Sequence, residues 1–291
     1  MNFRIPRAAP RYSSSGWKGC GSSPASRRLL LAANVLEIVH RQFTAPVAVL
    51  GSGIPAIDRI TGIGGYPRGR ITELFGTASS GKSALAVACC LNAAALGLTV
   101  VWIDLEHSLT AKLPLDPGPS ARDILLLEPQ TAEDAVDMAV ILLERADIDL
   151  LVMDSAIAMN PSRRPEGMPS NMARAEMVGR ALRKLTTLVA RRQCVMLFLS
   201  RSYLMAVPAS VASIGGGALR SFASLRLKTT QEQLSMDEGD LSSFAVRVRI
   251  VKNKLAPPEH EALLYYSLAD GTLAEEPPAM VAEEPGEEPW P

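Results

Sequence analysis

The sequence predicts an α/β protein whose core is a mostly parallel, twisted sheet flanked by helices. From residue 71 onward, short β-branched apolar runs alternate with amphipathic segments of helical period. Such alternation is typical of strand–helix units that place parallel strands side by side and cover them with helices. The 291 residues are 47% hydrophobic and 21% charged, a composition typical of a globular protein with a sizeable core.

Four regions follow one another along the chain. Residues 1–28 carry six basic residues and no acidic one and are rich in Ser, Gly and Pro, which predicts a flexible basic arm. Residues 29–62 are expected to form an N-terminal helix, with Leu29, Leu36 and Phe43 on one stripe, and its connection. The core is expected over 63–273. Residues 274–291, rich in Pro and Glu, are predicted to be an acidic disordered tail.

Within the core, the elements are predicted from periodicity and β-branched content. Strands are expected at 71–75, 100–104, 124–127, 150–154, 195–199, 223–228, 244–251 and 263–268. Helices are expected at 84–96, at 132–144 and along an apolar stripe from Val178 to Val189.

The sequence argues against a membrane protein and against a metal or disulfide scaffold. Residues 84–103 carry no charge, but Gly97 divides them into a small-residue helix and a buried strand, so no membrane span is predicted. The four cysteines include no C-x-x-C pair, which excludes the usual zinc and disulfide patterns. We expect a cytoplasmic protein.

A glycine-rich motif, G-x-x-x-x-G-K-[ST], lies between the first core strand and the first core helix. Its backbone N–H groups would surround a phosphate at a helix N-terminus, where the partial positive charge favours an anion. Lys82 would reach the β- and γ-phosphates, and the Ser83 hydroxyl would bind Mg²⁺. The predicted phosphate-binding residues are Gly76, Thr77, Ala78, Ser79, Ser80, Gly81, Lys82 and Ser83.

Two further carboxylates complete the expected site. Asp154 follows four apolar residues of a predicted strand, where it could hold Mg²⁺ through water. Asp104 and Glu106 stand at the end of another strand, and Glu106 is assigned the role of orienting an attacking water.

Charge is strongly segregated although the formal net charge is zero. Residues 104–149 hold eleven acids and three bases, whereas 163–220 hold ten bases and two acids. A polyanion would therefore bind in 163–220; the alternative is that oppositely charged faces are merely solvated and pair with each other.

Five strings follow one another in the order and spacing of the RecA recombinase family. They are Glu73-Leu-Phe-Gly-Thr-Ala-Ser-Ser-Gly-Lys-Ser83, Ile103-Asp-Leu-Glu-His107, Met153-Asp-Ser155, Gly215-Gly-Gly-Ala-Leu-Arg220 and Val251-Lys-Asn-Lys254. The chain resembles that family from about residue 29 to residue 268.

The resemblance implies a RecA-like P-loop ATPase core that uses ATP and Mg²⁺ and binds single-stranded DNA through two loops, at about 162–171 and 202–217. It implies that Glu106 is the catalytic glutamate and that Lys252 and Lys254 reach the γ-phosphate held by a neighbouring subunit. The DNA-binding candidates are Arg163, Arg164, Arg174, Arg201 and Arg220.

The chain also departs from the family pattern. Arg201 stands where the family has a glutamine that senses the γ-phosphate, and Ser221 stands where it has a phenylalanine central to subunit contact. The adenine-stacking tyrosine has no clear match in 108–115, and no RecA-type C-terminal domain is expected. These departures indicate a paralogue with weak self-association and weak, DNA-dependent ATP turnover.

The architecture is similar to the ImuA-type accessory proteins of SOS mutagenesis, which implies a role in translesion synthesis with RecA and a translesion polymerase as partners. Three alternatives remain: a non-hydrolysing regulator that binds RecA or a polymerase, a recombination mediator, and a metabolic or signalling ATPase without a nucleic-acid role. The basic stretch around both expected DNA loops disfavours the last.

Overall fold

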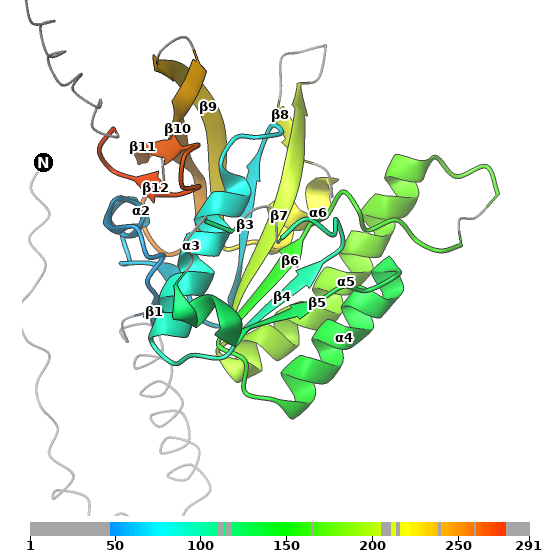
Figure 1. The fold of residues 1–291 in the computed structure, drawn as a ribbon. Helices are drawn as coiled ribbons and strands as arrows, with labels where there is room; N and C mark the ends of the chain where they lie inside the picture. The colour runs from blue at the N-terminus through cyan, green and yellow to red at the C-terminus, as the bar shows by residue number, and fades with distance from the viewer. Residues whose placement is uncertain are drawn as a thin grey trace, which may run out of the picture. The chain divides into compact units, whose positions relative to one another are not determined.

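A central sheet organises the protein, in the strand order β12-β11-β10-β9-β3-β7-β6-β4-β5, with β8 pairing with β7 (Figure 1). The strands from β9 to β5 run parallel to their neighbours, and β10, β11 and β12 continue the sheet in antiparallel pairing. The predicted α/β class with a mostly parallel sheet is confirmed.

The structure is a computed structural model that describes residues 47–109, 113–114, 118–163, 166–204, 211–213, 216–237, 240–258 and 260–277. The expected basic arm, the expected N-terminal helix, Arg164, much of the second DNA loop and most of the acidic tail lie outside these residues.

The strands that form the sheet have the following bounds. They are β3 (Arg70–Gly76), β4 (Val100–Asp104), β5 (Ile124–Leu127), β6 (Leu150–Asp154), β7 (Val195–Leu204), β8 (Val211–Ser213), β9 (Leu225–Asp237), β10 (Asp240–Asn253), β11 (Glu261–Ser267) and β12 (Leu273–Ala274). A separate two-stranded sheet pairs β1 (Val49–Leu50) with β2 (Tyr66–Pro67).

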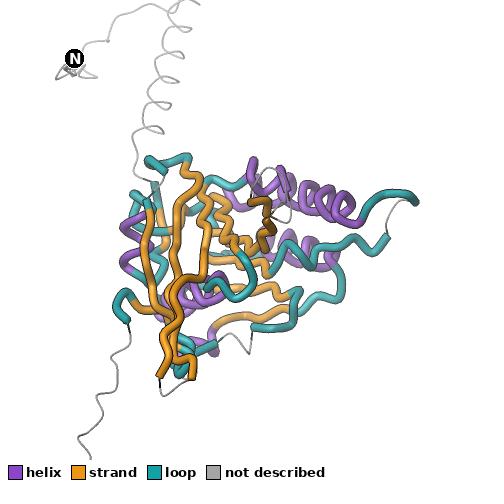
Figure 2. The backbone as a smooth tube through the Cα atoms, turned by 90° about the horizontal axis from the view of Figure 1, so that it is seen from above, coloured by secondary structure: helices purple, strands orange, loops and turns teal. Residues whose placement is uncertain are grey.

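Helices cover both faces of the parallel part of the sheet (Figures 1 and 2). They are α2 (Pro55–Ile60), α3 (Lys82–Ala95), the 3₁₀ turn η2 (Pro119–Asp123), α4 (Ala132–Arg145), α5 (Ser170–Arg192) and α6 (Gly216–Phe222). On one face Leu74, Trp102 and Val152 pack with residues of α3. On the other face Val101, Leu151 and Phe198 pack with α4 and α5.

Burial on both faces explains why the predicted parallel strands are continuous apolar runs. The alternating residues of each strand contribute to two different apolar clusters, so no position along β4 or β6 is exposed. The strong local signal of these runs is the reason that their bounds match the predicted ones.

The strands β7, β9 and β10 extend well beyond the predicted ranges of 195–199, 223–228 and 244–251. Strand β10 shows the reason: Val246 and Val248 are buried, whereas Arg247 is half-buried and Arg249 is exposed. Such alternation is typical of an antiparallel strand that is covered on one face, and it gives a weaker signal than an apolar run. The short elements α2, α6, β1, β2, β8 and β12 were not predicted.

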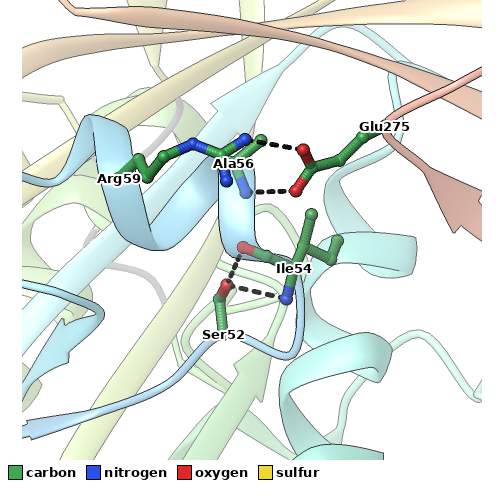
Figure 3. A network of polar contacts seen from close by, with 5 residues as sticks. All are labelled: Ser52, Ile54, Ala56, Arg59 and Glu275. Atoms are coloured by element: carbon green, nitrogen blue, oxygen red, sulfur yellow. Dashed lines mark hydrogen bonds and ion pairs between the residues drawn. The ribbon is translucent and has the colours of Figure 1, made fainter.

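The segment before the phosphate motif is part of the same packed body. Leu50, Ile54 and Ile57 lie in the apolar cluster that contains α3. At the other end of the described chain, Glu275 accepts hydrogen bonds from the Ala56 N–H at 2.6 Å and from Arg59 at 2.6 Å (Figure 3). Residues more than 200 positions apart are therefore joined at α2.

No helix among the described residues is long and apolar enough to cross a membrane.

Candidate nucleotide-binding site

A cleft of about 390 Å³ opens at the carboxyl ends of the parallel strands, beside the start of α3. Open α/β sheets bind ligands at this edge, because the loops that follow neighbouring strands meet there. The cleft is lined by Ala78, Ser79, Ser80, Gly81, Lys82, Ser83, Ala84, Glu106, Asp154, Ser155, Ser200, Arg201, Phe244, Tyr266 and Leu268.

The glycine-rich motif forms a tight loop between β3 and α3. A Cβ atom at Gly76 would collide with Thr229 and Ser80, and Gly81 has a φ of +85° at the N-cap of α3. Ser80 fastens the loop through its hydroxyl, which is 2.8 Å from the Thr77 carbonyl and 2.6 Å from Thr229 Oγ1. Neither glycine can be replaced without moving the backbone or its neighbours.

This loop fits a phosphate group. No side chain caps the N-terminus of α3 and no acidic residue lies in its first turn, so the helix presents its backbone N–H groups without a competing carboxylate. The Lys82 amine donates to the Thr77 carbonyl and lies 3.4 Å from Ser80 Oγ, which places a positive charge on the loop.

The two carboxylates at the end of β4 have different surroundings. Asp104 is fully buried and accepts backbone N–H groups from Glu106, Ser108 and Leu109 at 3.1, 2.7 and 2.7 Å. It therefore shapes the turn after β4. Glu106 lines the cleft instead, where the Ser155 hydroxyl donates to its Oε1.

Asp154 lines the same cleft at the end of β6 and is 2% exposed. It stands opposite Asp104 in the register of β4 and β6, so the predicted carboxylates and the phosphate loop come together. Among the described residues, no three His, Cys, Asp or Glu side chains gather closely enough to hold a metal ion alone. Ser83 and Asp154 suit Mg²⁺, which usually keeps several waters and binds through substrate phosphates.

Three residues far from the phosphate motif in the sequence form an apolar wall of the cleft. Phe244 in β10 and Tyr266 in β11 lie with their ring centroids 5.0 Å apart, and Leu268 lines the cleft beside them. No local pattern predicted this role, because each residue belongs to an ordinary apolar strand pattern.

A buried polar network beneath the cleft was also missed. Glu73 is fully buried and accepts hydrogen bonds from Ser200 Oγ and from Arg226 Nε, each at 2.5 Å. The Arg226 guanidinium lies 4.4 Å from the centre of the Phe75 ring. The sequence offers one signal for this network: Glu73 and Arg226 carry opposite charges, and each interrupts an apolar strand.

A second, cationic groove of about 400 Å³ lies apart from the cleft and is lined by Phe75, Arg220, Arg226, Lys228, Val251 and Lys252. Lys252 donates to the carbonyls of Arg220 and Ser221, and Lys254 donates to that of Ser221 at 3.3 Å. Burial lowers the pKa of Lys252 below its ordinary value, and the charges of Lys254 and Arg226 lower it further. Neither lysine lines the cleft beside α3 in its own chain.

The candidate DNA-binding arginines are dispersed. Arg163 is exposed, and Arg174 donates to Asn160 Oδ1 at 2.9 Å. Arg220 lies at the cationic groove, and Arg201 lines the cleft beside α3. The structure therefore divides the four described arginines among separate places.

Comparisons with known proteins agree with this arrangement. The family model for the RecA N-terminal domain matches residues 31–272. The chain is 35% identical over 221 residues to Protein RecA of Treponema pallidum, covering 73% of this chain and 54% of that protein. It is 36% identical over 226 residues to Protein RecA of Clavibacter michiganensis subsp. michiganensis, covering 75% and 62%.

A third relative, Protein RecA of Treponema denticola, is 33% identical over 260 residues, covering 84% of this chain and 63% of that protein. The chain thus spans less than two thirds of the length of each of these relatives.

Proposed function

Because the chain belongs to the RecA family, we propose that it is an ATP-binding DNA repair and recombination factor that acts on or with single-stranded DNA. The observation that carries this proposal is the cleft itself, in which a phosphate loop, Glu106 and Asp154 line one cavity.

The residues of the cleft have distinct roles in this proposal. The loop N–H groups and Lys82 bind the phosphates, and the apolar wall of Phe244, Tyr266 and Leu268 receives the base. Bound Mg²⁺ would neutralise phosphate charge from a position beside Ser83 and Asp154. Glu106, held by Ser155, takes a proton from water as the water oxygen bonds to the γ-phosphorus and the bond to the β–γ bridging oxygen breaks. The products are ADP and inorganic phosphate.

We further propose that the protein is a cytoplasmic accessory factor of the DNA-damage response, with RecA filaments and a translesion polymerase as partners. Support comes from two departures from the family pattern, Arg201 and Ser221, which separate this chain from a self-sufficient recombinase. In this proposal Lys252 and Lys254 act toward a nucleotide that a neighbouring subunit holds.

Equilibrium binding of ATP to Lys82→Ala tests the site. We expect the variant to lose ATP binding and to keep its far-UV circular dichroism, because Lys82 begins α3 outside the apolar core and its amine contacts the loop. Lys184→Ala is the matched control, since Lys184 is exposed on α5 and lies 3.8 Å from Asp137 on α4. Unchanged ATP affinity in folded Lys82→Ala would place the nucleotide elsewhere.

ATP hydrolysis measured with and without single-stranded DNA separates the factor from its alternatives. Stimulation by DNA supports the proposal, whereas binding without hydrolysis favours the non-hydrolysing regulator.

The salt dependence of DNA binding tests the DNA surface. Replacing Arg163 and Arg164 by alanine should lower the slope of log affinity for single-stranded DNA against log salt concentration by about 0.7 for each lost phosphate contact. An unchanged slope would show that the first expected DNA loop, at about residues 162–171, does not contact DNA.

A further inference from the structure

A carboxylate of a neighbouring helix holds the start of the first expected DNA loop. Ser162 donates its backbone N–H to Glu133 Oε1 at 3.0 Å and its hydroxyl to Glu133 Oε2 at 2.9 Å. Glu133 lies in the first turn of α4, 29 positions before Ser162 in the sequence. Both oxygens of one carboxylate are therefore bound by two donors of a single loop residue.

Positively charged side chains lie around this contact. Arg163 follows Ser162 directly and is exposed. Burial alone would raise the pKa of Glu133, but the hydrogen bonds from Ser162 and the nearby charge of Arg180 on α5 lower it below its ordinary value of 4.5. Glu133 is thus an ionised carboxylate at neutral pH, placed at the base of a cationic loop.

The groups that hold Glu133 also suit a phosphate. Backbone N–H groups, serine hydroxyls and arginine side chains are the usual donors to the phosphates of nucleic acids. An ionised carboxylate accepts hydrogen bonds from the same donors but repels a second anion that comes close. A phosphate can therefore take the two donors of Ser162 only when the Glu133 side chain leaves them.

The same pairing of acidic and basic segments recurs along α4. This helix belongs to the acidic stretch 104–149, and it lies beside α5 of the basic stretch on one face of the sheet (Figure 1). Further along the two helices, Lys184 on α5 lies 3.8 Å from Asp137 on α4. The acidic helix thus supplies counterions to the part of the chain that is expected to bind a polyanion.

We propose that Glu133 is an internal competitor of nucleic acid. Its carboxylate occupies the two donors of Ser162 that a phosphate of single-stranded DNA binds, and so lowers the affinity for DNA. Glu133 is half-buried, so its side chain can turn to solvent when a phosphate takes its place. This inference rests on the proposed function, in which the loop binds single-stranded DNA.

Binding of a fluorescently labelled oligodeoxythymidine, followed by anisotropy, tests the inference in Glu133→Gln, which removes the charge and keeps the size. We expect about tenfold tighter binding, the scale of one or two net hydrogen bonds. The slope of log affinity against log salt concentration should become steeper by about 0.7, because one more phosphate is contacted.

Asp134→Asn is the matched control. It removes the same charge from the same turn of α4, but the Asp134 carboxylate accepts from the Thr131 hydroxyl and not from the loop. Its effect on DNA affinity should be much smaller than that of Glu133→Gln. Equal gains in the two variants would show that charge at a distance is responsible, and would overturn the inference.

Ser162→Ala separates competition from a structural role of Glu133. In the wild-type background the hydroxyl is already bound by Glu133, so DNA affinity should change little. In the Glu133→Gln background the hydroxyl is available to a phosphate, so Ser162→Ala should remove part of the gain. An effect of Ser162→Ala that is the same in both backgrounds would contradict competition.

The remaining outcomes distinguish the inference from the proposed function. Weaker DNA binding by Glu133→Gln with unchanged far-UV circular dichroism would show that Glu133 holds the loop in its DNA-binding conformation; the inference then fails and the proposed DNA binding stands. DNA binding by Glu133→Gln alone, without any by the wild type, would support the inference. If neither protein binds single-stranded DNA, the proposed function fails and the inference fails with it.

Discussion

The buried ion pair between Glu73 in β3 and Arg226 in β9 connects two strands that are distant in the sequence. Both lie inside the sheet, directly opposite each other in the register of β3 and β9. Two buried charges are tolerated only when each is paired and hydrogen-bonded, and here Ser200 satisfies the second oxygen of Glu73. The pair therefore fixes the position of β9 and of the cleft residue Ser200.

At this scale we predict that Glu73→Ala lowers the free energy of unfolding by about 3–5 kcal/mol, because it leaves the Arg226 charge buried without its partner. Urea unfolding followed by circular dichroism measures the loss. Glu232→Ala is the control: it also removes the partner of an arginine, but Arg247 is accessible to solvent and keeps Glu261. Equal losses in the two variants would contradict the prediction.

At the scale of elements, the two helices α3 and α4 begin in different ways. The Thr131 side chain accepts the Asp134 N–H at 3.0 Å and caps α4. No side chain caps α3, whose N-terminus faces the cleft. The contrast supports the proposed function, since a cap on α3 would compete with a phosphate for the same N–H groups.

We predict that Thr131→Ala lowers the free energy of unfolding by about 1 kcal/mol, the usual loss when an N-cap hydroxyl is removed. Thr131→Ser should restore most of it, because serine supplies the same acceptor. Nucleotide affinity should not change in either variant. A loss of ATP binding in Thr131→Ala would contradict this prediction, because it would show that the start of α4 affects the cleft.

At the scale of the whole molecule, Glu275 ties the end of the described chain to α2 (Figure 3). The hydrogen bond from Arg59 holds the pKa of Glu275 below its ordinary value of 4.5; burial opposes this effect, and the Ala56 N–H supports it. A carboxylate whose folded pKa is lowered contributes stability above its unfolded pKa, and that stability is lost as pH falls through the folded pKa.

We predict that Glu275→Gln is less stable than the wild type at pH 7 and that the difference shrinks as pH falls below 4.5, the unfolded value. Thermal unfolding at a series of pH values measures the difference. A gap that persists unchanged at the lowest pH would mean that the packing of Glu275, rather than its charge, fastens the chain end.

Self-association is the second property of the whole molecule. Ser221 is exposed on α6, at the position where the family pattern has a phenylalanine of the subunit contact. A serine there buries little apolar area, whereas a buried phenylalanine contributes about 1.5–3 kcal/mol. We expect monomers or small oligomers in sedimentation velocity with ATP, and stronger association for Ser221→Phe than for Ser221→Ala. Long regular filaments of the wild-type protein on single-stranded DNA, seen by electron microscopy, would contradict this.

The local pattern of the sequence was enough to predict the parallel strands and to single out the glycine-rich loop, Asp154 and Glu106, which the structure places along one cleft. The roles of these residues toward a nucleotide stay predictions. These features depend on residues within a few positions of one another: an apolar run, a glycine spacing, a carboxylate at a strand end. Strand order was not encoded locally. For that reason the antiparallel extension, the short elements and the lengths of β9 and β10 were missed or underestimated.

The tertiary structure alone decided which distant residues meet. Arg201 was predicted as a DNA-binding residue from the chain alone; the insertion of β7 between β3 and β6 places it beside Gly76, where it lines the same cleft as Lys82. Phe244 and Tyr266 form one wall because β10 pairs with β11, and Glu73 meets Arg226 because β9 pairs with β3. The Glu73–Arg226 contact joins residues 153 positions apart, and the contacts of Glu275 with α2 join residues more than 200 positions apart. Their partners are set by sheet register, a long-range property that spacing along the chain does not reveal.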